Sequence, residues 1–209
     1  DAGVGNEFFP MLIFMGIGAM TDFGPLIANP KTAILGGAAQ LGVFITLFGV
    51  AVLNLIPGIE YNMFEAAAIA IIGGADGPTS IYLAGKLAPQ MMAVIAVAAY
   101  SYMALVPIVQ PPCIRLVTTW KERLIRMPYN PKKVTKTTRI LFPIVVTLIA
   151  GLIAPASAAL VGFLMFGNLL RECGVLDGLS DTAQKVLANL VTLLLGLTVA
   201  FSMKAEAFL

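Results

Sequence analysis

One stretch, residues 71–82, decides the fold of this chain: Ile-Ile-Gly-Gly-Ala-Asp-Gly-Pro-Thr-Ser-Ile-Tyr. The apolar residues on either side, 63–72 and 81–87, are typical of helix. The glycines and the proline between them interrupt that pattern, because glycine costs about 1 kcal/mol and proline about 3 kcal/mol in a helix interior. Pro78 suits the first turn of a new helix, where its missing N–H is not needed. The sequence therefore predicts a broken helix over residues 63–87.

The carboxylate of Asp76 falls within this break. Residues 63–87 are close to the ~20 residues that cross a bilayer, so the break is expected near the membrane centre. A carboxylate there costs roughly 2.5–3.5 kcal/mol and usually marks an ion or proton pathway. Unwound backbone at that depth lies within protein or along a water-filled cavity, where its carbonyls coordinate cations. With the hydroxyls of Thr79 and Ser80, this predicts a Na⁺ site of hard oxygen ligands.

A surface turn is the alternative interpretation, since Asp-Gly-Pro is common in turns, but the apolar flanks disfavour it. The composition supports a polytopic, all-α membrane protein: 59% of residues are hydrophobic and 11% charged, with mean hydropathy +0.92, against about 25% charged in soluble domains. The absence of histidine excludes a histidine general base and a zinc site. The two cysteines match no metal or redox spacing.

The basic residues are concentrated in one segment. Residues 115–139 carry eight Lys/Arg and a single acid, Glu122. Lys/Arg beside membrane spans is typical of the cytoplasmic side, so this segment is predicted to be cytoplasmic. A nucleic-acid patch is the competing interpretation of such a run, and a membrane protein gives it little support.

Further apolar segments predict the rest of the fold: a short one at 8–20, and spans at 32–55, 90–106, 140–154, 156–170 and 186–202. We expect the span at 90–106 to end at Pro107. Only Pro155 separates 140–154 from 156–170, which leaves tilted helices and a tight hairpin both open. Ser180 is predicted to start the helix that leads into the last span.

Outside the break, the functional candidates are Asn168, Asp22 and one of two tyrosines. Asn168 has no evident structural role, whereas the neighbouring Gly174 fits a helix C-cap. Asp22 is either a second cation ligand or, more commonly, an acid that ends a helix at the interface. Tyr100 and Tyr102 lie about 200° apart on a helix, so only one can face the Asp76 cavity, and a buried phenol there can donate a proton.

Four motifs resemble the β-subunit of the biotin-dependent, sodium-translocating decarboxylases: residues 73–79 (Gly-Gly-Ala-Asp-Gly-Pro-Thr), 99–107 (Ala-Tyr-Ser-Tyr-Met-Ala-Leu-Val-Pro), 167–172 (Gly-Asn-Leu-Leu-Arg-Glu) and 16–23 (Gly-Ile-Gly-Ala-Met-Thr-Asp-Phe). The resemblance covers essentially all of the chain. It implies that Asp76 binds Na⁺ and that Tyr102 takes part in proton delivery. It implies no particular residue for carboxybiotin binding.

The resemblance also implies the wider assembly. Family members act on carboxybiotin derived from oxaloacetate, methylmalonyl-CoA or glutaconyl-CoA. The biotin is expected on a partner subunit that is biotin carrier and carboxyltransferase, beside a small single-span membrane subunit. A multi-pass protein of the prokaryotic inner membrane, in contact with lipid and not with nucleic acid, is expected.

Two parts of the family's pattern are not found in this sequence. Members normally begin with additional membrane segments, and they end with a second glycine-rich broken helix followed by an arginine. In the family's inverted repeat, that element pairs with the break at Asp76. Residues 1–209 are therefore expected to form a single transmembrane domain that is half of the inverted-repeat architecture.

The expected function is decarboxylation of carboxybiotin coupled to Na⁺ export, with consumption of a proton. The alternative is a Na⁺-coupled secondary transporter of a small anion, whose architecture would be nearly the same. Dependence on biotin distinguishes the two, because a transporter should be indifferent to avidin.

Overall fold

The computed structural model describes residues 8–126 and 134–203, and within these ranges it contains helices and no strands. Five helical segments there are long and apolar enough to cross a membrane: Pro30–Leu53, Pro89–Val117, Lys136–Ile153, Pro155–Cys173 and Asp177–Phe201. The prediction of an all-α polytopic membrane protein is therefore confirmed.

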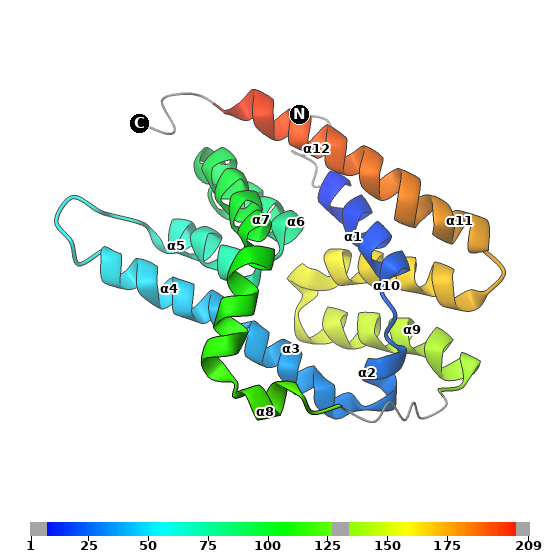
Figure 1. Ribbon diagram of the computed structural model, residues 1–209. Coiled ribbons are helices and arrows are strands. Elements are labelled where there is room, and N and C mark those ends of the chain that lie inside the picture. The colour runs from blue at the N-terminus through cyan, green and yellow to red at the C-terminus, as the bar shows by residue number, and fades with distance from the viewer. Residues whose placement is uncertain (1–7, 127–133, 204–209) are drawn as a thin grey trace.

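Most of the helices follow one another closely along the chain, and a longer loop joins α4 to α5 (Figure 1). Their bounds are α1 Phe8–Met20, α2 Gly24–Ala28, α3 Ala33–Ala39, α4 Leu41–Leu53, α5 Met63–Ala70, α6 Gly77–Leu87, α7 Met92–Val117, α8 Trp120–Arg123, α9 Lys136–Ile153, α10 Ala158–Cys173, α11 Asp177–Asp181 and α12 Ala188–Ser202. Single 3₁₀ turns lie at Pro30–Thr32, Ile71–Gly74, Pro89–Met91 and Pro155–Ser157, and a π-helical segment, Thr182–Leu187, joins α11 to α12.

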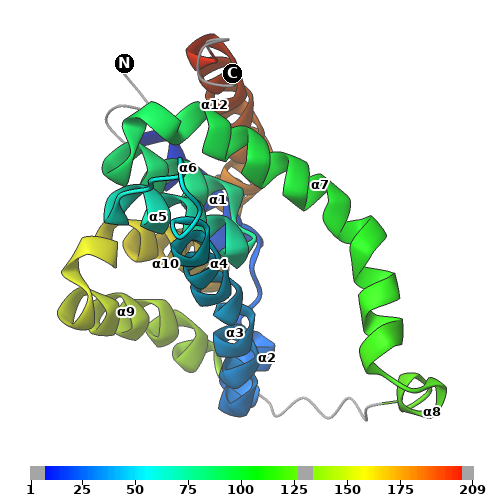
Figure 2. The same cartoon turned by 90° about the vertical axis from the view of Figure 1, so that its left-hand side faces the viewer.

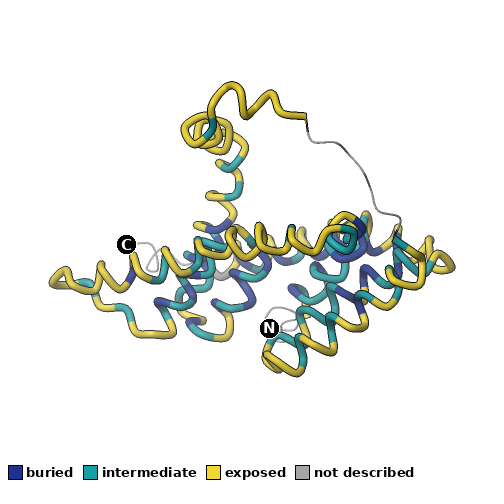
Figure 3. The backbone as a smooth tube through the Cα atoms, turned by 90° about the horizontal axis from the view of Figure 1, so that it is seen from below, coloured by how far each residue is buried: buried dark blue, intermediate teal, exposed yellow. Residues whose placement is uncertain are grey.

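Two groups of helices meet at α1. In the first group, α1 packs between α12 and α10, and α9 packs on the other side of α10. In the second group, α4, α5, α6 and α7 surround the 3₁₀ turn at Ile71–Gly74 (Figures 1 and 2). A buried apolar cluster joins the groups, with Ile13 of α1, Ile81 of α6, Ala96 of α7 and Leu195 of α12 among its members. Burial is concentrated along this seam, while the outer helix faces are exposed (Figure 3).

The exposed faces of the long helices are strongly apolar. Ile45 and Phe48 of α4 are 70% and 71% exposed, and Leu152 of α9 is 83% exposed. A soluble domain rarely carries large contiguous apolar patches, whereas lipid is as apolar as these side chains. The faces therefore suit contact with lipid or with further membrane helices.

The segments at 140–154 and 156–170 form a hairpin, so the structure selects one of the two arrangements that the sequence left open. Pro155 begins the 3₁₀ turn that connects α9 to α10, and the two helices pack side by side (Figure 1). Gly174 ends α10 in the left-handed conformation at φ 68°, which confirms its predicted role as the C-cap.

The predicted end of the third span at Pro107 is wrong. The helix α7 continues to Val117 through Pro107, Pro111 and Pro112, and it bends along its length (Figure 2). A proline removes its own N–H and crowds one carbonyl, which kinks a helix. Unwinding in apolar surroundings would leave many more backbone groups unpaired, so prolines are tolerated in membrane helices.

The predicted helix start at Ser180 is also wrong, by three residues. The helix begins at Asp177, and Ser180 lies buried inside α11. An acid in the first turn interacts favourably with the positive end of the helix dipole, so Asp177 is the better first residue.

Candidate functional site

The helix at residues 63–87 is interrupted where the sequence predicted the break. A capping box starts α5: the Asn62 side chain accepts from the Glu65 N–H, and the Glu65 carboxylate accepts from the Asn62 N–H. The helix ends at Ala70, and one 3₁₀ turn follows. Ala75 then takes the left-handed conformation at φ 56°, and Asp76 is extended. This backbone cannot continue a helix, so α6 starts afresh at Gly77.

The carboxylate of Asp76 caps α6. It accepts hydrogen bonds from the Thr79 N–H at 3.4 Å and from the Thr79 hydroxyl. The Ser80 hydroxyl donates instead to the backbone carbonyl of Asp76, at 2.8 Å. Asp76 and Thr79 are half-buried and Ser80 is fully buried. The structure thus brings all three predicted residues together, with Thr79 on the carboxylate and Ser80 on the main chain.

The helix α4 crosses the break at backbone contact distance. A Cβ on Gly42 would lie 2.2 Å from the Gly73 carbonyl oxygen, and one on Gly73 would lie 2.3 Å from the Gly42 carbonyl oxygen. The two backbones can approach this closely only because both positions are glycine. The Gln40 and Thr46 side chains of α3–α4 also reach the break, beside Gly74 and Gly73 respectively.

The tyrosine beside the break is Tyr100. A Cβ on Gly77 would lie 3.0 Å from Tyr100 Cζ and 3.2 Å from the sulfur of Met103, so the ring and the thioether cover the first residue of α6. Tyr102, on the opposite face of α7, is not among the nearest neighbours of Gly77. Both tyrosines are exposed, Tyr100 at 39% and Tyr102 at 44%. The predicted 200° separation therefore holds, with Tyr100 on the side of the break.

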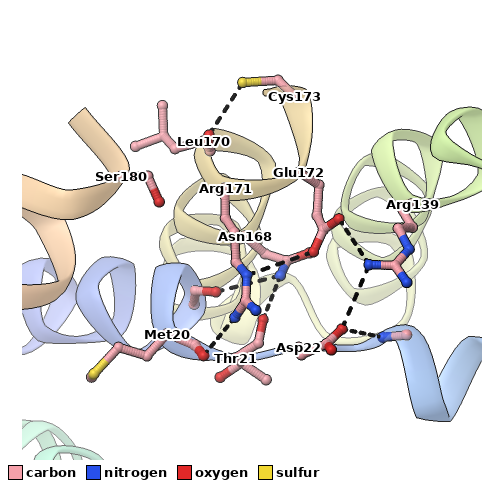
Figure 4. Close-up of polar contacts among 12 residues, drawn as sticks. Met20, Thr21, Asp22, Arg139, Asn168, Leu170, Arg171, Glu172, Cys173 and Ser180 are labelled. Atoms are coloured by element: carbon pink, nitrogen blue, oxygen red, sulfur yellow. Dashed lines mark hydrogen bonds and ion pairs between the residues drawn. The ribbon is translucent and has the colours of Figure 1, made fainter. Parts of the chain in front are cut away.

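A second polar cluster lies where α10 crosses the end of α1 (Figure 4). Asn168 is 1% exposed, and its Nδ2 donates to the carbonyls of Thr21 at 2.9 Å and Gly18 at 3.4 Å. Its Oδ1 has no hydrogen-bond partner within the described residues. Arg171, one turn later, donates to the Met20 carbonyl at 2.7 Å. Asn168 and Arg171 thus cap the C-terminal carbonyls of α1 from another helix.

The charged residues around this cluster form a chain of ion pairs. Arg139 lies 3.5 Å from Glu172 and 3.9 Å from Asp22, and Arg171 lies 3.8 Å from Glu172 (Figure 4). Asp22 also accepts from the Gly24 N–H at 2.8 Å. These contacts give Asp22 a structural role directly after the end of α1, in line with the helix-ending alternative. Its position at a membrane interface stays a prediction.

The described part of the basic segment 115–139 includes α8, which a second capping box starts. The Thr119 N–H donates to the Glu122 carboxylate at 2.7 Å and holds the pKa of that carboxyl below its ordinary value. Residues 127–133 of the segment lie outside the described residues. Its cytoplasmic side stays a prediction.

An open apolar pocket of about 410 Å³ lies between α6, α7 and α12. Tyr100, Ser101 and Thr192 bring hydroxyl groups to its lining, and the other lining residues are apolar or glycine. Tyr100 lines the pocket and also lies against Gly77, the first residue of α6. The pocket is therefore adjacent to the break.

Within residues 8–126 and 134–203, no cluster of three or more His, Cys, Asp or Glu could hold a metal ion. The donors at the break are instead one carboxylate, hydroxyls and main-chain carbonyls. Such hard oxygen ligands suit an alkali cation better than a transition metal. This donor set fits Na⁺ as a transported ion.

The fold and the site define a polytopic helical membrane protein with an acid at the interruption of a helix. Within that class, the chain belongs to the family described as Na⁺-transporting oxaloacetate decarboxylase beta subunit, whose sequence profile matches residues 1–209. It is 55% identical over 206 residues to the oxaloacetate decarboxylase beta chain of Klebsiella pneumoniae, covering 99% of this chain and 47% of that protein.

Two further relatives carry other substrate names. The chain is 55% identical over 207 residues to the glutaconyl-CoA decarboxylase subunit beta of Acidaminococcus fermentans, covering 99% of this chain and 53% of that protein. It is 57% identical over 209 residues to the methylmalonyl-CoA decarboxylase subunit beta of Veillonella parvula, covering 100% and 54%. The chain thus spans about half the length of the curated relatives that it matches. The family membership supports the decarboxylase interpretation and not the secondary transporter.

Proposed function

We propose that this chain is part of a membrane subunit that decarboxylates carboxybiotin and couples the reaction to Na⁺ export, with consumption of a proton. The observation that carries the proposal is Asp76, held by Thr79 at the interruption of a helix in a member of a Na⁺-transporting family. Carboxybiotin is brought by a biotin-carrier and carboxyltransferase subunit, beside a small single-span subunit. The assembly lies in the inner membrane of a prokaryote.

Asp76 and Thr79 are the central cation ligands in this proposal. Their side chains already touch, so one ion can contact both oxygens. Ser80 contributes less directly, because its hydroxyl donates to the Asp76 carbonyl and orients the main chain at the break. The Asp76 carboxylate also balances the positive end of the α6 dipole. Main-chain carbonyls at the end of the 3₁₀ turn complete the proposed ligand set.

The proton follows from the chemistry of carboxybiotin. The bond between the carboxyl carbon and the ureido nitrogen breaks, CO₂ leaves, and the electron pair stays on the nitrogen, which must take a proton. That single proton comes either from Tyr102 or from protonated Asp76. The resemblance to the family, and not a position beside the break, is what favours Tyr102, because the ring next to Gly77 is that of Tyr100. A bound Na⁺ favours the ionised carboxylate, so the arrival of Na⁺ displaces a proton from Asp76 toward the ureido group.

Asn168 has a supporting role in this proposal. Its amide fixes the end of α1, near the ion pair of Asp22 with Arg139, while its Oδ1 lacks a partner among the described residues. Buried acceptors without a partner are rare and often coincide with functional positions. Asn168 therefore stays a candidate functional residue, apart from the cation ligands.

The experiment that tests the function is decarboxylation of free carboxybiotin by the complete complex, with and without Na⁺. We expect CO₂ release that Na⁺ stimulates, and avidin should block turnover of the natural carboxylated substrate. Na⁺-driven uptake of an anion that avidin does not affect would establish the transporter instead. Failure to release CO₂ at any Na⁺ concentration would refute the proposal.

A further inference from the structure

Two polar side chains interrupt an otherwise apolar span. Between Ala33 and Leu53, the only residues with polar side chains are Gln40 and Thr46. Polar groups in a membrane-crossing helix usually face the protein interior or a water-filled cavity. The positions of Gln40 and Thr46 on the helix should therefore indicate where a polar site lies inside the protein.

Both side chains lie on the face of α3–α4 that covers the helix break. The Gln40 Oε1 lies 3.4 Å from the position of a Cβ on Gly74, and the Thr46 Oγ1 lies 2.5 Å from the position of a Cβ on Gly73. These glycines are the last residues of the 3₁₀ turn before Asp76. The two polar groups of the span thus approach the unwound backbone beside the carboxylate.

The hydrogen bonds of this region leave side-chain oxygens available. The Thr46 hydroxyl donates to the Gly42 carbonyl at 2.9 Å, so its own lone pairs stay unused by that bond. The backbone N–H of Gln40 donates to the carbonyls of Gly36 and Ala38, so it does not use the side-chain oxygen of Gln40 as its acceptor. Gln40 is exposed, and its Oε1 lies at the edge of the break, beside Gly74.

We propose that Gln40 supplies a neutral oxygen ligand to the cation at the break and so helps to set the ion selectivity of the site. A carboxamide oxygen adds a ligand without adding charge, which keeps one carboxylate against one monovalent ion. Because Gln40 comes from a helix other than that of Asp76, it fixes the width of the site across two elements. This inference rests on the proposed binding of Na⁺ at Asp76.

A purely structural role for Gln40 predicts something different. If the side chain only fills space against Gly74, a residue of equal length should replace it. Gln40→Met keeps the length and flexibility of the side chain and removes the oxygen ligand. Gln90→Met is the matched control, because Gln90 is exposed and bonds to Glu65 at the start of the broken segment.

The test uses the intact complex and measures the rate of decarboxylation against Na⁺ and against Li⁺. In Gln40→Met we expect the half-saturating Na⁺ concentration to rise about tenfold, equivalent to about 1.4 kcal/mol, with the maximal rate kept at saturating Na⁺. The ratio of Li⁺ to Na⁺ affinity should also change. Gln90→Met should leave both quantities as they are in the wild type.

The outcomes separate the two hypotheses. Wild-type values in Gln40→Met, with a wild-type complex that requires Na⁺, overturn the role of Gln40 and leave the proposed function intact. A wild-type complex that does not respond to Na⁺ overturns the proposed function itself. If Gln40→Met does not assemble, Gln40→Glu replaces it: we expect tighter Na⁺ binding at neutral pH, and an unchanged affinity would refute the ligand role.

Discussion

Gly42 and Gly73 bring two helical segments into direct backbone contact, each Cα lying against the carbonyl oxygen of the other. We predict that Gly42→Ala separates α4 from the break, because the added Cβ would lie 2.2 Å from the Gly73 oxygen. Such overpacking costs about 1–3 kcal/mol, and Tm falls by roughly 2–4 °C per kcal/mol in a chain of this size. Thermal unfolding of the complex in detergent measures the effect.

Gly49→Ala on the same helix is the control for this prediction. A Cβ at Gly49 would meet nothing within 4 Å, so this variant should keep the Tm of the wild type. Equal stability of the two variants would mean that the backbone of α4 does not pack closely against the break at Gly73.

The second prediction concerns Asp76→Asn. Asparagine is as good an N-cap as aspartate, so it can still accept from the Thr79 N–H and α6 should fold. The ionised carboxylate is lost, and Na⁺-dependent turnover should be abolished in a complex that still assembles. Asp181→Asn, at an exposed ion pair with Lys185, should leave turnover unchanged. Normal Na⁺ activation in purified Asp76→Asn complex would remove Asp76 from the ion site.

The third prediction separates the two tyrosines. Tyr102→Phe removes only a hydroxyl, so packing should survive while proton delivery fails. Tyr100→Phe should be mild, because the contact of Tyr100 with Gly77 is made by ring carbons that phenylalanine keeps. Na⁺-dependent decarboxylation of both variants across pH is the measurement. Greater damage in Tyr100→Phe would transfer the proton-donating role to the ring beside the break.

The fourth prediction concerns Asn168. In Asn168→Asp, a carboxylate oxygen replaces the Nδ2 donor that bonds the Thr21 and Gly18 carbonyls, in a place that is 1% exposed. An uncompensated buried charge is destabilising by about 3–5 kcal/mol. Asn168→Ala takes the same donor from the Thr21 and Gly18 carbonyls but adds no charge, so its loss should be smaller, about 1–3 kcal/mol. A Tm of Asn168→Asp equal to that of Asn168→Ala would contradict this account.

The fifth prediction concerns membrane topology. A single cysteine at Lys121, in a background without Cys113 and Cys173, should resist an impermeant thiol reagent applied from outside intact cells. It should react once the membrane is permeabilised, because the segment 115–139 is expected in the cytoplasm. Prompt labelling from outside would reverse the predicted orientation.

The sequence predicted those features that depend on a residue's own backbone preferences. The interruption at Asp76, the extent of α1 and the C-cap at Gly174 follow from glycine, proline and apolar patterning, and the structure contains each of them. The continuation of α7 through Pro107 does not follow from those preferences. It depends on the cost of unpaired backbone in apolar surroundings, which local propensity does not include.

The sequence did not predict which side chains meet across helices. The periodicity of α7 separated Tyr100 from Tyr102, but only the packed position of α6 decides which of them lies at the break. Nothing in the local pattern places Gln40 beside Gly74, because that approach requires α4 to cross a segment more than thirty residues later. The ion pair of Asp22 with Arg139 likewise joins residues that only tertiary structure brings together.

The crossing of α1 and α10 limits how this protein can move. A Cβ on Gly18 would lie 1.8 Å from the Leu164 carbonyl oxygen, and one on Gly167 would lie 1.9 Å from the Met15 carbonyl oxygen. Displacing one helix along the other by a turn would drive larger side chains into those positions. We therefore expect the pair to move as one rigid body in the proposed transport cycle, with hinges outside it, at non-helical joints such as residues 21–23 and 174–176.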